Sequence, residues 1–225
     1  MTENVRFVFT DDLCLSIKNH EKNENKRRNS SFNVEVFSPE RCTECDRKIL
    51  YDVYDGQAQT QISEAQNNLR HKWASLMMRM PNVILHGVAV EFSDVKYNLH
   101  GSVDMILEFE NRDIKAIGMV REVDAETMSK IREKGPMRKD VLTDMMYMWL
   151  SEIPNAIMIY EDSKNREVEI YHAVPYNAII ETTREKFGRL VNYKLHGLNV
   201  ERPYSNQDNK ECSSCRHKVK CWKEK

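Results

Sequence analysis

Three cysteines lie close together near the C-terminus of this 225-residue chain, at Cys212, Cys215 and Cys221. Two cysteines separated by two residues can bind one metal centre from a single turn of the chain, and the third can reach it after a short loop. Zinc and iron–sulfur clusters both take thiolate ligands, and both commonly have four protein ligands. We therefore interpret the segment as part of a cysteine-bound metal centre that needs a fourth ligand from elsewhere in the chain.

Cys45 is the candidate for that fourth ligand, and Cys42 lies three residues before it. A ligand set of one plus three would clasp the two ends of the chain together, and closing so long a loop restricts the unfolded chain. This pattern favours an iron–sulfur cluster. Zinc remains an alternative, because Cys42 and Cys45 together would form a second paired knuckle. The third alternative, ordinary surface thiols, fits poorly with three thiols in one short polar segment.

The composition indicates a globular protein with a solvated surface. Hydrophobic residues make up 40% of the chain and charged residues 31%, and the net charge of −1 gives no overall attraction to nucleic acid. Any DNA binding must therefore come from a local cluster of basic residues. We find no apolar run long enough to span a membrane and no signal peptide, so we expect a cytoplasmic protein whose thiols stay reduced.

The order of the predicted elements indicates an α/β fold with one mixed sheet and flanking helices. We expect an N-terminal extension over residues 1–35 and a single domain over 36–225, whose last part, 205–225, is a polar cysteine tail. The extension begins with a strand-like stretch at 5–9 and contains a basic cluster at 26–28. Hydrophobic periodicity and turn residues predict helices at 38–56, 60–80, 137–152 and 176–195, and strands at 83–92, 101–109, 114–123, 155–161 and 166–173.

The segment around Cys45 and the cysteine tail together resemble the RecB-like branch of the PD-(D/E)XK nuclease superfamily, especially CRISPR-associated and phage-encoded exonucleases. In that family a lone cysteine precedes an arginine, here Cys45 and Arg47, and a C-x-x-C-x5-C tail is often followed by tryptophan, here Trp222. The resemblance implies a restriction-endonuclease-like core and DNA as the substrate. It also implies a 4Fe–4S cluster, bound by Cys45, Cys212, Cys215 and Cys221, that clasps the N- and C-terminal segments.

A second group of motifs in the same family concerns the catalytic metal. The family's Gly-x-x-Asp motif matches residues 101–104, and the resemblance implies that Asp104 binds Mg²⁺ or Mn²⁺. The following (D/E)-x-K positions fall on Gly118 and Val120, which supply neither the carboxylate nor the lysine. The helix motif Gln-x-x-x-Tyr retains only Tyr147, and the resemblance implies that this tyrosine lines the DNA groove.

Nearby carboxylates offer a way to rebuild the metal site. Glu122 lies on the same face of its strand as Val120, and a bulge or register shift could bring Glu122 and Asp124 to Asp104. The lost amine could come from Lys130 or Lys134, and His71 on the preceding helix could add a metal ligand. The alternative is that all of these are ordinary surface residues.

Three hypotheses of function follow. The first is a metal-dependent DNA exonuclease or endonuclease acting on DNA ends or single strands, with Asp104, Glu122, Asp124 and Tyr147 as its catalytic residues. The second is a catalytically inactive relative that binds DNA or a replication or recombination protein. The third is a zinc-bound structural protein. Arg47, Lys48, Arg70 and Lys72 could contact phosphates, and the small size and loose motif match suggest a phage origin.

Overall fold

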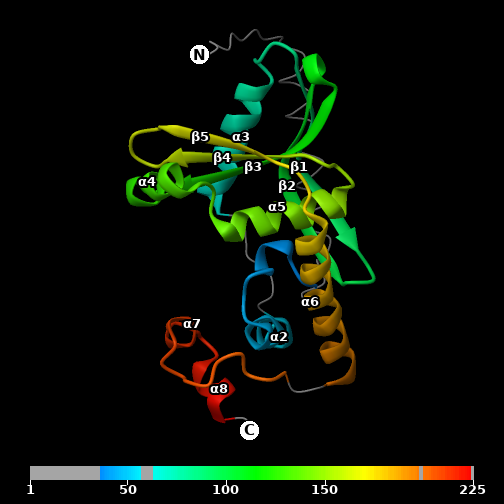
Figure 1. Ribbon diagram of the computed structural model, residues 1–225, viewed down its shortest axis with the longest axis vertical. Helices are drawn as coiled ribbons and strands as arrows, with labels where there is room; N and C mark the ends of the chain where they lie inside the picture. The colour runs from blue at the N-terminus through cyan, green and yellow to red at the C-terminus, as the bar shows by residue number, and fades with distance from the viewer. Residues whose placement is uncertain (1–35, 57–62, 198–199, 224–225) are drawn as a thin grey trace.

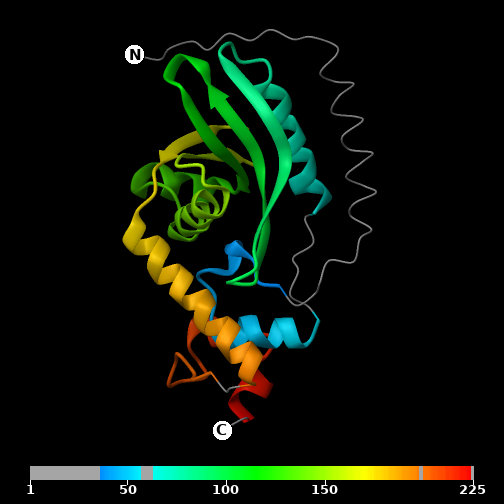
Figure 2. The same cartoon turned by 90° about the vertical axis from the view of Figure 1, so that its right-hand side faces the viewer.

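A computed structural model describes residues 36–56, 63–197 and 200–223. Figure 1 shows the elements around one central sheet, and Figure 2 shows them from the side. In chain order the described elements are η1 (Pro39–Arg41), α2 (Asp46–Tyr54), α3 (Glu64–Met77), β1 (Val83–Asp94), β2 (Leu99–Phe109), η2 (Glu110–Arg112), β3 (Ile114–Val123), α4 (Ala125–Lys134), α5 (Arg138–Ser151), β4 (Ala156–Asp162), β5 (Val168–Ala173), α6 (Asn177–His196), α7 (Lys210–Ser213) and α8 (Lys218–Lys223).

The sheet is mixed, with its five strands in sequence order from β1 to β5. The β1–β2, β2–β3 and β4–β5 pairs are antiparallel, whereas β3 and β4 run parallel. A parallel pair needs a crossover connection, which α4 and α5 supply between these two strands. Strand β3 is buried on both faces along most of its length, as expected for a central strand with the apolar run Ala116–Val120.

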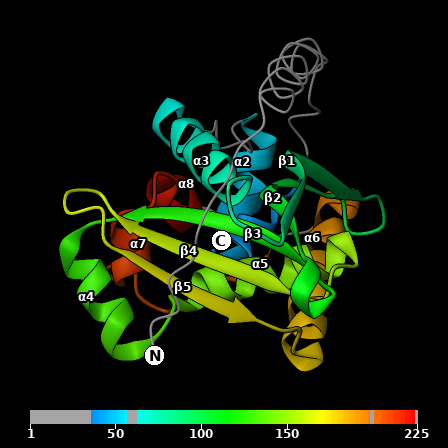
Figure 3. The same ribbon diagram turned by 90° about the horizontal axis from the view of Figure 1, so that it is seen from above.

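Helices cover both faces of the sheet. Helix α3 packs on one face, where Leu69, Trp73 and Met77 meet apolar side chains of β2, β3 and β4. Helices α4 and α5 lie on the other face (Figure 3). Figures 1 and 2 show α6 leading away from the sheet to α2, α7 and α8, which gather at one end of the molecule. We call this end the cysteine lobe.

The α/β fold class predicted from the sequence is confirmed, and most elements match their predicted ranges within a few residues. The prediction of one helix over 38–56 was wrong. That segment is divided into the short turn η1 and helix α2, because Cys45 has an extended backbone and forms the N-cap of α2. Helix α4 was missed, although Asp124 caps its start and Gly135 ends it at a φ of +84°. The predicted strand at 5–9 and the basic cluster at 26–28 lie outside the described residues.

The described helices were also compared with the length and apolarity that a membrane-spanning helix needs. None of them is both long enough and apolar enough to cross a lipid bilayer.

Candidate functional site

Strands β2 and β3 separate at a fork in the sheet, and Asp104 lies at that fork. Their pairing runs from Phe109–Ile114 as far as Met105–Gly118 and then ends. Beyond this point side chains replace the missing strand partner of Val120. Its N–H donates to Asp104 Oδ2 at 2.7 Å, and its carbonyl accepts from Gln66 Nε2 of α3 at 2.9 Å. Asp104 therefore satisfies a backbone donor that the fork would otherwise leave buried without a partner.

The second oxygen of Asp104 is bound by an arginine. Arg70 of α3 donates from Nε to Asp104 Oδ1 at 2.7 Å, and the two side chains are only 3% and 4% exposed. A buried charge is stable only when it is paired and hydrogen-bonded, and here each side chain neutralises the other. Both carboxylate oxygens thus already have partners within the protein. Arg70, suggested as a phosphate contact, is instead an internal residue.

The two (D/E)-x-K positions have apolar surroundings. Val120 is fully buried in the cluster that includes Leu107 and Ile159. A Cβ atom on Gly118 would lie 3.4 Å from Leu107 Cδ1 and from Met105 Cβ, in van der Waals contact with apolar side chains. The fork therefore contains neither the second carboxylate nor the lysine of the family motif.

The carboxylates proposed to rebuild the site make other contacts. Strand β3 pairs with β4 in unbroken register through Val123, and the register shift of the sheet lies instead in β1 between Leu85 and Gly87. Glu122 is exposed and accepts from Arg166 at 3.3 Å, and Asp124 accepts from the Thr127 N–H as the cap of α4. The shift that the rebuilt site required is therefore not present in β3.

His71, Lys130 and Lys134 are the other residues that were proposed for the rebuilt metal site. His71 is half-buried on α3, next to Arg70, and Lys130 forms an ion pair with Glu126 at 2.5 Å. Lys134 is exposed at the C-terminal end of α4. Within the described part of the chain, no three His, Cys, Asp or Glu side chains are arranged to hold a metal ion. The predicted site of Asp104, Glu122 and His71 is thus not assembled.

Tyr147 connects three elements in the interior. Its side chain is completely buried, and its hydroxyl donates to Glu40 of η1. Gly101 of β2 packs directly against this hydroxyl, and a Cβ atom there would also lie 3.0 Å from Pro39 Cδ. The expectation that Tyr147 lines a DNA groove is corrected: burial, with the nearby charge of Glu40, raises its pKa, and it holds η1 against the sheet.

A buried ionic network around Arg121 of β3 was not predicted from the sequence. Arg121 donates to Asp140 and to Asp144, both at 3.1 Å, and Tyr160 donates to Asp140 at 2.9 Å. Asp144 Oδ2 is buried and has no hydrogen-bond partner among the described residues. Burial raises the pKa of Asp144 to about 7 despite the nearby guanidinium. The available signal was Asp144 itself, an acidic residue inside the apolar run Leu142–Leu150.

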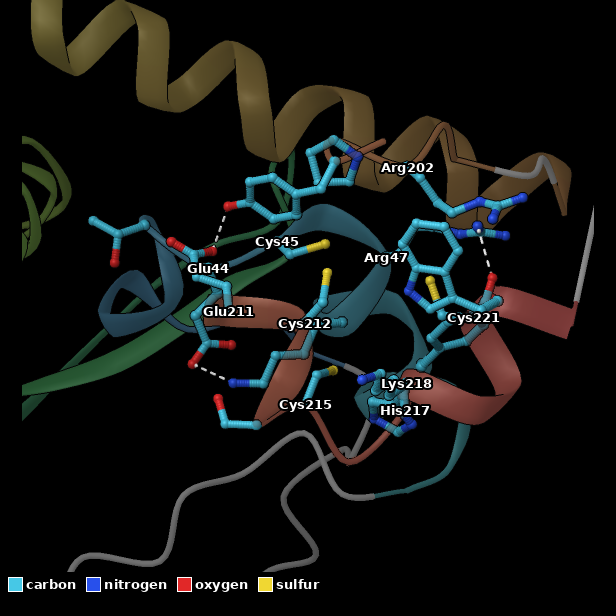
Figure 4. Close-up of a pocket in the computed structure, with 17 residues that line it drawn as sticks. Glu44, Cys45, Arg47, Arg202, Glu211, Cys212, Cys215, His217, Lys218 and Cys221 are labelled. Atoms are coloured by element: carbon cyan, nitrogen blue, oxygen red, sulfur yellow. Dashed lines mark hydrogen bonds and ion pairs between the residues drawn. The ribbon is translucent and has the colours of Figure 1, made fainter. Parts of the chain in front are cut away.

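The cysteine lobe contains a partly open cavity of about 290 Å³ that Cys45, Cys212, Cys215 and Cys221 all line. Figure 4 shows their sulfur atoms around this cavity. Cys45 comes from the N-cap of α2, and the other three come from α7, the following turn and α8. Burial raises the pKa of the Cys45 and Cys212 thiols, and a neighbouring cysteine contributes to each increase. The four thiols that the sequence singled out therefore meet at one place.

This donor set consists of four thiols around one cavity, and zinc and iron–sulfur clusters both accept thiolate ligands. Among the described residues, these four cysteines included, no three His, Cys, Asp or Glu side chains are arranged to hold a single metal ion. A cubane cluster binds each thiolate at a different iron and so accepts a wider spacing. Cys42 does not line the cavity: it packs in the core, with its sulfur 3.8 Å from Thr143 Oγ1. The second zinc knuckle of Cys42 with Cys45 is therefore not formed.

The other basic residues suggested as phosphate contacts are also engaged. Arg47 is buried beside the cavity and donates to the Cys221 carbonyl at 3.3 Å. Lys48 pairs with Glu44 at 3.2 Å, and Lys72 pairs with Glu161 at 2.5 Å while remaining 44% exposed. Of this set, Lys72 is the most open to solvent.

Comparisons with known proteins identify the fold. No protein-family model matches the chain, and no curated protein matches it. Among solved structures, an alkaline exonuclease from Laribacter hongkongensis aligns with a TM-score of 0.56 at 9% identity, covering 73% of this chain and 90% of that one. The same enzyme in complex with dAMP gives a TM-score of 0.57 at 10% identity over the same shares.

A second solved structure, SSO0001, aligns over more of the chain. Its TM-score is 0.52 at 15% identity, and the alignment covers 92% of this chain and 96% of that one. These likenesses, with the mixed sheet between helical layers, show that the chain has the restriction-endonuclease-like fold.

Proposed function

We propose that this protein is a non-catalytic member of the nuclease fold that binds DNA without cleaving it. The observation that carries the proposal is the buried Arg70–Asp104 ion pair at the fork of the sheet. It lies where the resemblance to the RecB-like nucleases puts the catalytic metal. In this chain the positive charge beside Asp104 is the guanidinium of Arg70.

The chemistry of the fork supports this proposal over an active nuclease. Magnesium and manganese need several oxygen ligands, usually two carboxylates with water and substrate phosphate. A metal ion at Asp104 would have to displace Arg70 and leave a buried guanidinium unpaired, which typically costs about 3–5 kcal/mol. The Val120 N–H would lose its acceptor as well. The first hypothesis, a metal-dependent exonuclease or endonuclease, therefore requires a rearrangement that the second does not.

The cysteine lobe forms a separate part of the proposal. We infer that Cys45, Cys212, Cys215 and Cys221 hold a 4Fe–4S cluster, which would cross-link α2 to the C-terminal tail. Four thiols that line one cavity support a thiolate-bound centre, and the resemblance to the RecB-like nucleases favours the cluster over zinc. When bound, such a cluster supplies structural cross-linking and a redox-active centre.

DNA is the proposed partner because of the fold. The alkaline exonuclease that shares the fold has been crystallised with dAMP. A protein that retains the fold and lacks the metal site could hold DNA ends or single strands for another enzyme. We place it in a replication or recombination assembly, where a binding subunit of this kind would act with a catalytic partner.

DNA cleavage and DNA binding are measured on the same anaerobic preparation. Labelled single-stranded and duplex DNA are incubated with manganese and the wild-type protein or Asp104→Asn, with a known manganese-dependent nuclease as the positive control. We expect no cleavage by either protein. Fluorescence anisotropy should show binding of at least one substrate, with an affinity that falls as salt increases. Manganese-dependent cleavage by the wild type that is lost in Asp104→Asn would establish the nuclease instead, and the absence of any binding would remove DNA as the partner.

The cluster is tested by elemental analysis of the same preparation. We expect iron and acid-labile sulfide in the wild type, together with a brown colour. Cys215→Ala should lose the colour and most of the iron and unfold at a lower temperature. Cys42→Ala is the matched control and should keep its iron, because Cys42 does not line the cavity. A colourless wild type that contains zinc would contradict the assignment.

A further inference from the structure

Asp52 lies on the same side of α2 as the cysteine that the helix contributes to the cavity. Cys45 caps the helix, and Asp52 follows seven residues later, which is two helical turns. Asp52 is 2% exposed, although it belongs to a short helix in a small lobe. A buried carboxylate at such a position needs several donors, and it has them.

Two of these donors come from the cysteine tail. Arg216 donates to Asp52 Oδ1 from Nε at 2.7 Å and also from Nη2, and His217 donates to the same oxygen from Nε2. Both residues lie between Cys215 and Cys221. The carboxylate thus binds the tail directly after Cys215 and just before α8, which carries Cys221.

The other oxygen of Asp52 faces the N-terminal side of the lobe. Arg41 of η1 donates to Oδ2, and it also forms an ion pair with Glu44 at 2.7 Å. Burial alone would raise the pKa of Asp52, but the hydrogen bonds from His217, Arg216 and Arg41 outweigh that effect and lower it. Asp52 is therefore ionised at neutral pH and joins η1, α2 and the tail by charged hydrogen bonds, which are stronger than neutral ones.

Cys45 is held in place by a different contact. Lys186 of α6 donates to the Cys42 carbonyl at 2.9 Å and to the Glu44 carbonyl, and it pairs with Asp46 at 3.3 Å. This lysine fixes the backbone on both sides of Cys45 against α6. The loss of Asp52 would consequently weaken the docking of the tail and leave Cys45 where it is, while Arg47 and Asp55 keep their contacts with Cys221 and Lys220.

We propose that Asp52 is the positioning residue that docks the tail on α2 and so brings three cysteines to Cys45 before any iron is bound. This inference rests on the proposed cluster for its purpose, because a preformed set of four thiols would lower the entropic cost of assembling the cluster. It does not rest on the cluster for its geometry, since the contacts of Asp52 involve protein groups alone.

The test uses chemical cross-linking to determine whether the thiols lie close together in the iron-free protein. Reduced, iron-free protein is treated with dibromobimane, which bridges two thiols only when they are close together, and the bridged peptides are identified by mass spectrometry. We expect wild-type protein to form bridges between Cys45 and the tail cysteines. Asp52→Asn, which preserves the shape of the side chain and removes its charge, should form them severalfold less.

Two further variants separate docking from general stability. Arg216→Gln changes a half-exposed partner on the tail and should also reduce bridging while the circular dichroism of the sheet and helices is unchanged. Glu185→Gln, at an exposed position of α6, is the control, and its bridging should remain close to the wild-type level. Equal bridging in wild type, Asp52→Asn and Arg216→Gln would overturn the proposal, as would no bridging in the wild type.

The same variants distinguish the docking role of Asp52 from the binding of an iron–sulfur cluster. On anaerobic reconstitution with iron and sulfide, Asp52→Asn should take up severalfold less iron per chain than Glu185→Gln. If the wild type bridges its thiols through Asp52 but binds no iron, the docking role stands and the cluster is rejected. If Asp52→Asn loads iron and bridges like the wild type, the docking role is rejected and the cluster stands.

Discussion

Asp144 is the buried acidic residue whose environment favours the neutral carboxyl. It shares Arg121 with Asp140, and one of its oxygens has no hydrogen-bond partner among the described residues. Burial raises its pKa to about 7, compared with about 4 for an aspartate in an unfolded chain. The folded protein therefore binds a proton at Asp144 in a pH range where the unfolded chain has released it.

This difference predicts how stability changes with pH. The raised pKa gives a stabilising contribution that is complete below about pH 4 and is lost as the pH rises through about 7. Asp144→Asn should make stability less dependent on pH between about 5 and 8, and it should be more stable than the wild type at the upper end. The shift corresponds to at most about 4 kcal/mol.

Urea unfolding of the wild type and Asp144→Asn at several pH values measures this effect. The histidines titrate in both proteins, so the difference between the two curves isolates Asp144. Asp113→Asn, at an exposed turn, is the control and should follow the wild type at every pH. A difference curve that does not change with pH would contradict the raised pKa.

At the residue scale the sequence predicted some positions and not their partners. The Gly-x-x-Asp motif indicated Asp104 as a metal ligand, but nothing in the spacing indicated that Arg70, 34 residues earlier, would pair with it. Pairing of this kind depends on how α3 packs on the sheet, which is a tertiary property. The same holds for Asp52, whose partners in the tail lie more than 160 residues away.

At the scale of the elements, periodicity predicted the strands and the long helices well. The strand at 114–123 was predicted with its observed bounds, because its ends carry clear turn residues. The split of the segment around Cys45 could not be predicted in this way. A serine followed by proline starts a helical turn equally well whether it continues or stops after one turn, and the extended backbone of Cys45 decides the outcome.

The fork is also a property of elements. Strands β2 and β3 pair only over the part that runs from their hairpin to Gly118, and α3 then inserts Gln66 and Arg70 where pairing stops. In the family that the sequence resembles, the catalytic residues occupy such positions on these strands. Here the same opening is filled by these side chains, and Arg70 Nη1 is buried there without a hydrogen-bond partner among the described residues.

At the scale of the whole molecule, the proposed cluster and the fork belong to different parts. Figures 1 and 2 show α2, α7 and α8 at one end, connected to the sheet through η1 and α6. The core cluster that joins them includes Phe37, Ile49, Met146 and Phe187. Clasping the tail to α2 would stabilise this end of the chain, whereas the ion pair at the fork stabilises the sheet.

The central claim is that the fork holds an internal ion pair instead of a metal ion, and a double-mutant cycle on Arg70 and Asp104 tests it most directly. Arg70→Met, Asp104→Asn and the double variant are unfolded in urea with and without manganese. Each single variant should lose about 3–5 kcal/mol, because each leaves one buried group without its charged partner.

The double variant should lose less than the sum of the two, with a coupling of about 2 kcal/mol or more. Manganese should not change the stability of the wild type, because a ligand stabilises only the state that binds it. We expect strong coupling between Arg70 and Asp104 and no response to manganese. Additive effects, together with a wild type that manganese stabilises and an Asp104→Asn variant that it does not, would contradict the internal ion pair and identify Asp104 as a metal ligand.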